Sequence, residues 1–416
     1  MTQHFWPENF RINDIVEGFL AEGLEVDVLC GLPNYPKGEW FDGYGPQGPF
    51  EEFYHTAQVF RAKEWPRRGN TSLNIFLNYV SWPLYAAGAL HRLPGGYDAV
   101  FCFNTSPVLM CWPAIRYARK HHVPFTNYVL DLWPENLYSV LPVQNRALRA
   151  VAQGVSDWLY KRCDRLIAMS APLALRLQQR TGKPAEQVAV IPQYCEDFYA
   201  VPCPDEALQA RFAGRFNLVF TGTFTPAQSL ETVIHAVGLA RQQTDVDLHL
   251  LLVGDGMSRA ALEQLVQQED AAGYVTFYGS VPATDVPRFT TLADALIVSL
   301  SDSPDLGLTV PGKVASYMAA GKPVLASMDG AGHEAVAQAG GLASPACDVP
   351  ALADNLLRLC RMDEAERAGM GGQIRRYYET HYRRAEILRR LKDFILNGTV
   401  CAARGRAVRV NCEVFL

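Results

Sequence analysis

A lysine stands near the start of a helix in the segment LTVPGKVASYMAAGKPV, residues 308–324. Pro311 and Gly312 open the helical pattern, Lys313 lies in its first turn, and Gly321 ends it before an apolar strand. A helix N-terminus carries partial positive charge, so a lysine there is unfavourable unless it shares the position with an anion. The segment therefore predicts that Lys313 contacts a diphosphate; the alternative is a lysine that faces solvent.

Two glycine turns in the same half of the chain could approach such an anion closely. Gly222 follows the apolar run 217–221, and Gly254, Asp255 and Gly256 follow the apolar run 248–253. Glycine lets a turn come near a ligand, and parallel strands bring their carboxyl ends to one edge of a sheet. The third glycine of the dinucleotide fingerprint is missing, which disfavours a NAD site. Ordinary strand-to-helix turns remain the alternative.

These segments need a sheet to hold them, and the rest of the sequence predicts one. Short apolar runs alternate with amphipathic helical patterns such as 229–241 and 258–269, which is typical of doubly wound α/β domains. The expected strands are 25–30, 99–103, 125–130, 165–169, 188–191, 217–221, 248–253, 275–278, 295–299 and 323–326.

A stretch with three prolines and no periodicity, residues 191–204, divides the strands into two series. We expect an amino-terminal domain over 1–195 and a ligand-binding, carboxyl-terminal domain over 196–378. A charged helix over 379–398 should pack back toward the amino domain, and 399–416 should form a loosely held tail. Few apolar residues precede the first turn, so we expect the natural start to lie upstream of Met1.

The composition argues against several classes of protein. Of the 416 residues 49% are hydrophobic, and the net charge is −5, so neither disorder nor nucleic-acid binding is expected. The ten cysteines show neither C-x-x-C nor zinc-ligand spacing, which favours reduced thiols in a cytoplasmic protein. The first ten residues lack the pattern of a signal peptide, and no uncharged apolar run reaches about 20 residues.

The motifs, taken together, resemble a known family. Those of the carboxyl half are similar to the donor half of glycosyltransferase family 4, retaining enzymes with the GT-B fold: residues 222–231, VGDG (253–256), PGKVASYMAAGKPV (311–324) and Asp329-Gly330. Those of the amino half resemble a subgroup that builds O-antigen, capsule or colanic-acid repeats, including transferases for N-acetyl-L-fucosamine: FWPENFRIND (5–14), GLPNYPKG (31–38), NTSP (104–107) and DLWPE (131–135). The resemblance covers nearly the whole chain.

This resemblance implies two Rossmann-like domains that face a cleft. It implies transfer of a sugar, such as N-acetyl-L-fucosamine, from a UDP-linked donor to a lipid-linked saccharide in bacterial surface-polysaccharide synthesis. The anomeric configuration would be retained. No metal and no cofactor are expected, since the nucleotide-sugar is a substrate, and nucleic acid is not an expected partner.

The resemblance also implies roles for individual residues. Lys313 would contact the diphosphate, and Asp131 and Glu135 would lie near the acceptor. The loop after Gly279, near Val281, would hold the nucleotide base through its backbone. The remaining residues expected around the donor are Gly222, Gln228, Gly254, Asp255 and Gly256.

The sequence departs from the family pattern in the donor half. Many members carry an arginine and a lysine after the first glycine turn, where this chain has Thr223 and Gln228. Two family glutamates fall on Leu308 and Ser316, so both carboxylates are missing. We interpret this as a trait of the subgroup. The partners of the ribose and of the sugar hydroxyls stay open, and the candidates are Asp305, Ser316 and Glu334.

Cleavage of a nucleotide-sugar builds negative charge on the departing diphosphate, so preorganised donors there should do most of the catalytic work. The leaving-group oxygen can accept the proton of the acceptor hydroxyl. Glu8 and Asp131 are the alternative bases.

The segment 72–93 is aromatic and apolar, and basic residues flank it: Arg61, Lys63, Arg67, Arg68, His91 and Arg92. A basic rim beside an apolar helix could rest on an anionic membrane, so peripheral contact with the cytoplasmic face of the inner membrane is one interpretation. Packing of this helix into the amino-domain core is the alternative.

Two other functions remain open at this point. A nucleotide-sugar 2-epimerase shares the GT-B fold, but it would need acid and base groups around the sugar that the amino-half motifs do not suggest. A non-catalytic binding protein would explain the missing glutamates.

Overall fold

The computed structural model describes residues 1–140 and 145–399, so all but the first residue of the expected tail, 399–416, lies outside the described part. The described chain forms two compact units. The amino unit contains Met1–Ala168, Leu177–Ile191 and the described residues from Ala385 onward. The carboxyl unit contains Met169–Arg176 and Pro192–Arg384, so a short segment before residue 177 joins the second unit although it precedes the predicted linker.

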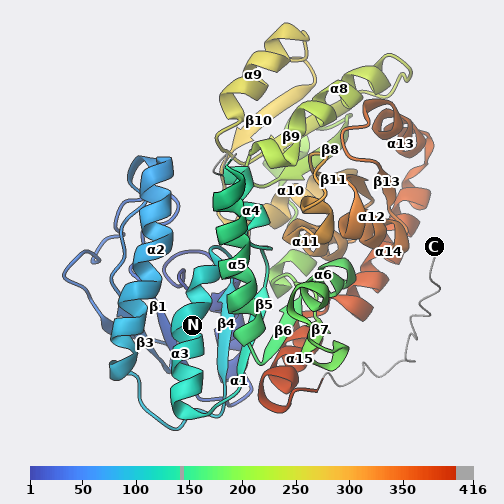
Figure 1. Ribbon diagram of the computed structural model, residues 1–416. Coiled ribbons are helices and arrows are strands. Elements are labelled where there is room, and N and C mark those ends of the chain that lie inside the picture. Colours follow the sequence, from blue (N-terminus) through green and yellow to red (C-terminus); the bar gives the residue numbers. More distant parts are fainter. Residues whose placement is uncertain (141–144, 400–416) are drawn as a thin grey trace. The chain divides into compact units, whose positions relative to one another are not determined.

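The amino unit is built on parallel strands (Figure 1). One sheet has the order β1-β3-β2, with β1 at Asp27–Gly31, β2 at Glu51–Tyr54 and β3 at Ala57–Ala62. The other has the order β4-β5-β6-β7, with β4 at Val100–Asn104, β5 at Phe125–Val129, β6 at Arg165–Ala168 and β7 at Val188–Val190. Every pair is parallel except β2 with β3.

The first three residues join these two sheets. The amide of Thr2 donates to Leu29 at 3.1 Å, and the carbonyl of Gln3 accepts from Gly31 at 2.8 Å. On the other side the ammonium of Met1 donates to the carbonyl of Phe101 at 2.6 Å. Met1 to Gln3 therefore occupy the position between β1 and β4 that the first strand of a Rossmann-like sheet takes.

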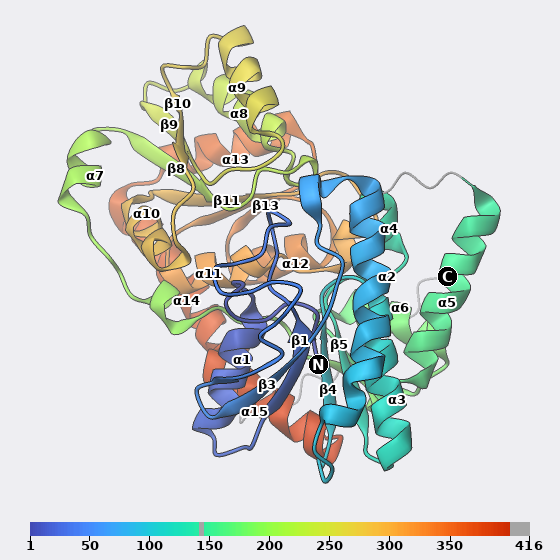
Figure 2. The same ribbon diagram turned by 90° about the vertical axis from the view of Figure 1, so that its left-hand side faces the viewer.

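Helices cover both faces of the amino-unit sheet, as Figure 2 shows. The helices α2 (Ser72–Ala89), α3 (Cys111–His121) and α5 (Arg146–Arg162) lie on one face, and α1 (Arg11–Ala21) and α15 (Arg384–Asn397) lie on the other. The short α4 spans Glu135–Val140, and α6 (Ala171–Thr181) runs across the boundary between the units. Among residues 1–140 and 145–399, no helix has both the length and the apolarity needed to cross a bilayer.

The carboxyl unit has one parallel six-stranded sheet with the order β10-β9-β8-β11-β12-β13. Its strands are β8 (Phe216–Thr221), β9 (Leu248–Val253), β10 (Val275–Gly279), β11 (Ala295–Ser299), β12 (Val324–Ser327) and β13 (Leu342–Ser344). Its helices are α7 (Glu206–Arg211), α8 (Leu230–Arg241), α9 (Arg259–Gln268), α10 (Val286–Leu292), α11 (Gly312–Ala320), α12 (Gly330–Gln338), α13 (Val349–Arg361) and α14 (Glu364–His381).

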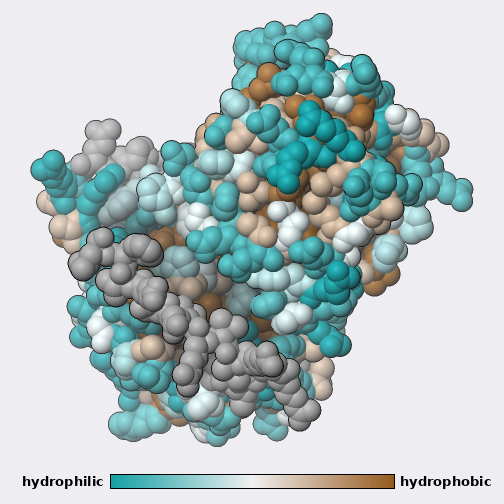
Figure 3. Space-filling model, turned by 90° about the vertical axis from the view of Figure 1, so that its right-hand side faces the viewer, coloured by the Kyte–Doolittle hydropathy of each residue, from teal (hydrophilic) through white to brown (hydrophobic). Residues whose placement is uncertain are grey.

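Alternating side chains of these strands fill two separate cores. Leu250 and Leu252 of β9 pack in one core with α8 and α13, whereas Leu251 and Val253 pack in the other with α11 and α14. Successive side chains of a strand point to opposite faces, so a strand covered on both faces must be apolar throughout. This explains the continuous apolar runs of the sequence. Hydrophilic side chains dominate the surface in Figure 3, where hydrophobic ones form small separate areas.

The ten predicted strands are confirmed to within about two residues, which is the usual uncertainty of an element boundary. The strands β2, β3 and β13 were not predicted. The hairpin of β2 and β3 turns at His55, which has a positive φ of 54° without the glycine that normally marks such a turn. The helix predicted over 379–398 is divided in the structure: α14 ends at His381, and α15 spans Arg384–Asn397 and belongs to the amino unit from Ala385 onward.

Arg61 is a buried part of the amino unit and does not belong to a basic rim, which corrects the sequence-based interpretation. Its side chain on β3 is 0% exposed and forms an ion pair with Glu52. The guanidinium also donates to the carbonyls of Gly31 at 2.8 Å and Trp6 at 2.5 Å. Arg61 thus holds together β1, β2 and the loop that follows Met1–Gln3.

We expect Arg61→Met to lower the free energy of unfolding of the amino unit by about 3 kcal/mol, because it leaves Glu52 and two carbonyls without their donor. Urea unfolding followed by circular dichroism measures the loss. Arg259→Met is the control, since Arg259 forms exposed ion pairs on α9. Such pairs contribute about 0.5 kcal/mol or less. Equal effects of the two substitutions would contradict the assigned role of Arg61.

Candidate functional site

The ammonium of Lys313 lies among polar and aromatic groups of the carboxyl unit. Its Nζ donates to Oε1 of Gln228 at 2.5 Å and lies 3.8 Å from the ring centre of Phe220. A Cβ atom placed on Gly222 would lie 3.0 Å from the same Nζ. The structure therefore brings together Lys313, Gln228 and Gly222, three of the residues predicted around the donor.

The glycine turns at the ends of β8, β9 and β10 are bonded to one another. The amide of Gly222 donates to Val253 at 2.9 Å, and the amide of Gly254 donates to Gly279 at 2.9 Å. A Cβ on Gly254 would approach the carbonyl oxygen of Gly222 to 1.9 Å, and one on Gly256 would approach that of Phe224 to 2.3 Å. The close packing of the turns therefore requires glycine at positions 254 and 256 even without a ligand. The sequence had suggested close approach to a ligand as the reason for these glycines.

The first turn of α11 lies at the same edge of the sheet. Within the described chain Pro311 provides no side-chain cap, and the amide of Val314 donates to the Pro311 carbonyl at 2.9 Å, so the amides of Gly312 and Lys313 are the ones open to an anion. One turn further on, the hydroxyl of Tyr317 accepts a hydrogen bond from the amide of Thr221 at 2.7 Å. Tyr317 therefore fixes α11 to the end of β8 and holds Lys313 beside Gly222. As predicted, Gly321 ends the helix, in a left-handed conformation with φ 68°.

Burial lowers the pKa of Lys313 to about 7. The described part of the chain places no carboxylate in an ion pair with it, and the Gln228 amide is a neutral partner. A bound anion would favour the charged form and raise this pKa again. The site is thus suited to a ligand that brings negative charge.

The other residues predicted around the donor make no direct contact with Lys313 in the described chain. The carboxylate of Asp255 accepts from the amide of Gly256 at 2.7 Å and pairs with Arg259 at 3.3 Å, so it stabilises its own turn. Val281 is half-buried after Gly279, and Asp305 precedes the short 3-10 helix Leu306–Leu308. Ser316 is buried on α11, and Glu334 is exposed on α12.

Glu8 occupies a buried network in the amino unit. One of its oxygens accepts from the amides of Asn34 and Tyr35, each at 2.7 Å, and the other lies 2.8 Å from Nδ1 of His4. With 2% of its surface exposed, Glu8 anchors the loop after β1. These contacts occupy both of its oxygens, which makes it less suited than Asp131 to accept a substrate proton.

Glu64 lies beside Glu8, and the sequence did not single it out. Burial, and next the charge of Glu8, raise the pKa of Glu64 well above its usual range. The side chain of Asn34 donates to one oxygen of Glu64 at 2.6 Å, and that of Gln3 donates to the other at 2.6 Å. Asn34 therefore links the two carboxyl groups through its backbone and its side chain.

Asp131 and Glu135 have different surroundings although four positions separate them. Burial raises the pKa of Asp131 to about 7. Glu135 instead pairs with Arg180 at 3.1 Å within the amino unit. Asp131 therefore has the pKa of a general base at neutral pH, whereas the Glu135 carboxylate is held by an arginine.

Tyr35 lies within electrostatic range of both Asp131 and Arg67. The guanidinium of Arg67 lies 5.6 Å from the ring centre of Tyr35 and 5.0 Å from that of Tyr79. Burial raises the pKa of Tyr35, and Asp131 is among the charges that raise it further. Within the described residues, the Nε atom of Arg67 is buried without a hydrogen-bond partner.

The sequence did not predict a site role for several of these residues. Phe220 and Tyr317 give no signal, because each has the pattern of an ordinary core residue. Asn34 lies in the GLPNYPKG segment, where a polar residue among prolines was the available clue, and Arg67 was predicted only as part of a basic rim.

Two family models match the two halves of the chain. The model described as "Glycosyltransferase Family 4" matches residues 10–193, and the one described as "Glycosyl transferases group 1" matches residues 215–362. The second match contains Gly222, Gln228, the turns after β9 and β10, and Lys313. The first contains Asp131, Glu135 and the loop after β1.

Known proteins of similar sequence are glycosyltransferases. The probable glycosyltransferase WbjE of Pseudomonas aeruginosa is 26% identical over 290 residues, which are 67% of this chain and 69% of that protein. A GDP-mannose-dependent alpha-(1-6)-phosphatidylinositol monomannoside mannosyltransferase of Mycobacterium tuberculosis is 25% identical over 268 residues, covering 62% of this chain and 66% of that protein.

Solved structures share the fold. Sucrose-phosphate synthase from Thermosynechococcus elongatus superposes with a TM-score of 0.71 at 18% identity, over 92% of this chain and 91% of that one. Anabaena Alr3699/HepE in complex with UDP and glucose has a TM-score of 0.68 at 16% identity, over 95% and 98%. With the family matches, these similarities identify the chain as a glycosyltransferase with the GT-B fold.

We expect the affinity for UDP-glucose to fall by about tenfold or more between about pH 6 and pH 8.5, because Lys313 loses its charge as the pH rises through about 7. A nucleotide-sugar is the suitable probe, since its diphosphate lacks the proton of a phosphate monoester that titrates near pH 6. Isothermal titration calorimetry across this pH range measures the change.

Lys313→Arg and Lys313→Met serve as paired controls. The arginine keeps its charge and should remove the pH dependence, whereas the methionine should bind weakly at every pH. A wild-type affinity that stays constant over the range would contradict the assigned titration.

Proposed function

We propose that this glycosyltransferase transfers a sugar from a UDP-linked donor to a lipid-linked saccharide, with retention of the anomeric configuration. The donor would bind the carboxyl unit and the acceptor would bind the amino unit. The proposal requires no metal ion, because Lys313 and the start of α11 supply positive potential for the diphosphate.

The position of Lys313 is the observation that carries this proposal. Its ammonium is buried beside Gly222, and its partners among the described residues are a neutral hydrogen-bond acceptor, Gln228, and the face of Phe220. When the bond from the anomeric carbon to the diphosphate breaks, negative charge grows on the leaving group. A fixed ammonium beside that group favours the transition state over the bound substrate.

The choice of UDP follows from structures of similar proteins. Alr3699/HepE has been solved with UDP, with UDP and glucose, and with UDP-glucose. The mycobacterial relative depends on GDP-mannose, so GDP-linked sugars are the second donor class. The base would lie against the backbone near Val281, and Asp305, Ser316 and Glu334 are the candidates for the ribose and sugar hydroxyls.

The amino unit supplies groups for an acceptor. We assign Asp131 as the base that receives the proton of the attacking hydroxyl, either directly or after the leaving-group oxygen has taken it. Arg67 would face an anionic part of the acceptor, because its buried Nε has no partner among the described residues. A phosphate that links a saccharide to a lipid carrier has this charge. Glu8 would position the loop that carries Tyr35.

A role in surface-polysaccharide synthesis is supported by one similar protein. WaaG, with a TM-score of 0.67 at 15% identity, is a glycosyltransferase involved in lipopolysaccharide biosynthesis. We propose N-acetyl-L-fucosamine as the first sugar to test. The enzyme would work at the cytoplasmic face of the inner membrane, where lipid-linked saccharides are available.

A donor panel tests this function. The protein is incubated with UDP-N-acetyl-L-fucosamine, UDP-N-acetylglucosamine, UDP-glucose or GDP-mannose and a lipid-linked saccharide, and products are identified by mass spectrometry. One donor should give a glycosylated acceptor, and Lys313→Met should lower kcat/KM by about 10²–10³-fold. An epimerised donor without acceptor, or donor binding without any product, would contradict the proposal.

The pH profile of kcat/KM separates the two titrating groups. It should rise as Asp131 loses its proton and fall as Lys313 loses its charge, with both changes near pH 7. Asp131→Asn should lower kcat by about 10²-fold or more and remove the rising limb. Glu135→Gln is the control, because Glu135 is held by Arg180, and it should keep that limb. A rising limb that persists in Asp131→Asn would exclude this base.

A further inference from the structure

The helix α5 presents an apolar stripe to solvent in addition to its packed face. Leu148, Val151, Val155 and Trp158 are 59%, 62%, 42% and 42% exposed. Their spacing of three, four and three residues places them on one side of the helix. The packed side is formed by Ser156, Leu159 and Tyr160, which are buried. An apolar stripe of this length on a surface helix indicates an interaction surface.

Basic residues far outnumber acidic ones on α5 and on the neighbouring helix α3. The helices α3 and α5 contain seven arginines and lysines and one acidic residue, Asp157, which pairs with Arg180 at 2.7 Å. The basic residues are Arg116, Arg119, Lys120, Arg146, Arg149, Lys161 and Arg162. The whole chain carries a net charge of −5, so this positive face is a local feature. It would attract an anionic partner through its potential.

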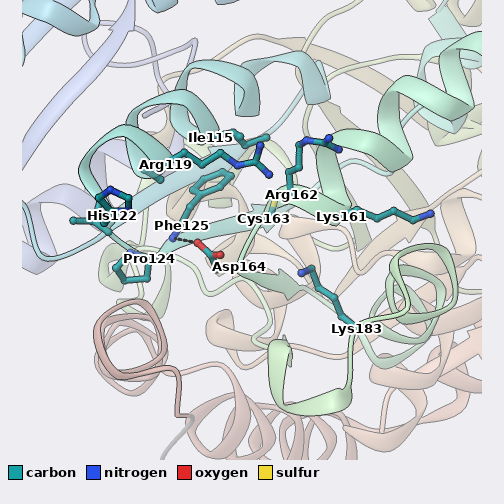
Figure 4. Close-up of a pocket in the computed structure, with 12 residues that line it drawn as sticks. Ile115, Arg119, His122, Pro124, Phe125, Lys161, Arg162, Cys163, Asp164 and Lys183 are labelled. Atoms are coloured by element: carbon teal, nitrogen blue, oxygen red, sulfur yellow. Dashed lines mark hydrogen bonds between the residues drawn. The ribbon is translucent and has the colours of Figure 1, made fainter.

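A basic cavity lies at the carboxyl-terminal ends of these two helices. Its volume is about 540 Å³, and its lining includes Arg119, His122, Lys161, Arg162 and Lys183. The single carboxylate of the lining, Asp164, accepts from the amide of Phe125 at 2.8 Å and is therefore engaged by the backbone. Figure 4 shows Arg119 reaching over Phe125 toward Arg162, while Lys183 points toward Cys163 and Asp164.

Arg162 connects the cavity with the stripe. Its guanidinium lies 3.9 Å from the ring centre of Trp158, the last residue of the stripe. The Nε atom of Arg162 is buried without a hydrogen-bond partner in the described part of the chain. Cations in the last turn of a helix also offset its dipole. That effect explains neither the exposed apolar side chains of α5 nor the cation that Lys183 adds from outside both helices.

We propose that the α3–α5 face docks on the surface of a bilayer that contains anionic phospholipid. The stripe of α5 enters the boundary between headgroups and acyl chains, and the cavity beside Arg162 takes a lipid phosphate. A row of apolar side chains flanked by cations matches such an interface, which is apolar below a negatively charged layer. The surface is formed by other helices than the segment 72–93 and does not depend on the proposed transfer reaction.

The helix α2 is the competing surface, since Leu73, Phe76, Leu84 and Tyr85 are also exposed there. Its expected basic rim is weaker than the sequence suggested. Arg61 is buried, and Arg92 pairs with Glu51 at 3.2 Å and donates to the carbonyl of Arg61 at 3.0 Å. The α3–α5 face has both an apolar stripe and a basic cavity, which favours it as the docking surface.

Vesicle co-sedimentation of the full chain, without donor or acceptor, tests the proposal. Vesicles of phosphatidylcholine with about one third phosphatidylglycerol should bind the protein at least about tenfold more tightly than vesicles of phosphatidylcholine alone. The binding should weaken as salt rises, because screening shortens the range of the attraction. Equal binding to the two kinds of vesicle would overturn the proposal.

Paired variants locate the surface. Val151→Ser with Trp158→Ser removes part of the stripe, and Arg119→Gln with Lys183→Gln removes cations of the cavity; each pair should lower vesicle affinity about tenfold or more. Phe76→Ser with Leu84→Ser on α2 and Arg358→Gln with Arg376→Gln, two exposed arginines of the carboxyl unit, are the matched controls. Unchanged binding by either α3–α5 pair would exclude that part of the surface.

All four pairs change exposed or half-buried side chains, and none of these residues belongs to the group of contacts around Lys313. Their affinity for UDP-glucose should therefore equal that of the wild type, which verifies that each variant is folded. If vesicle binding fails while transfer to an acceptor succeeds, the docking surface is wrong and the proposed function stands. If the protein binds vesicles but transfers no sugar to any acceptor, the docking surface stands and the proposed function is wrong.

Discussion

An ammonium group that is held among backbone turns loses much of its hydration, and the structure replaces that loss only partly. The amide oxygen of Gln228 and the face of Phe220 are the groups in contact with Lys313. Because its hydration is replaced only in part, the pKa of Lys313 is lowered to about 7. Because an anion would remove this penalty, the carboxyl unit is prepared for a negatively charged ligand before any ligand arrives.

The amino unit also buries ionisable groups, and hydrogen bonds stabilise them there. Glu8 and Glu64 lie close together, and hydrogen bonds from Asn34, Tyr35 and Gln3 make their burial tolerable. These bonds hold the loop after β1, whose Tyr35 lies near Arg67 and Asp131. Burial raises the pKa of Asp131, whereas the Glu135 carboxylate is held in an ion pair with Arg180. Two neighbouring acidic residues of one motif therefore serve different purposes.

Charge also distinguishes the faces of the amino unit. Its sheet edge carries buried, compensated groups, whereas α3 and α5 carry exposed cations with a single acidic residue between them. Buried charges must be paired or lose their charge, but exposed cations remain free to act on a partner at a distance. Under the proposed function, such a face would raise the local concentration of an acceptor that is held in a bilayer.

The sequence by itself determined the class of fold, because parallel strands buried on both faces must be continuous apolar runs. It also determined Lys313 at a helix start and the glycine turns, since both leave local signals. Only the tertiary structure decided that Gly254 and Gly256 are needed for packing between turns, that Glu8 anchors a loop, and that Arg61 is buried. It also decided that Asp131 and Glu135 differ. Those properties arise from contacts between residues far apart in the chain, and no local pattern encodes such contacts.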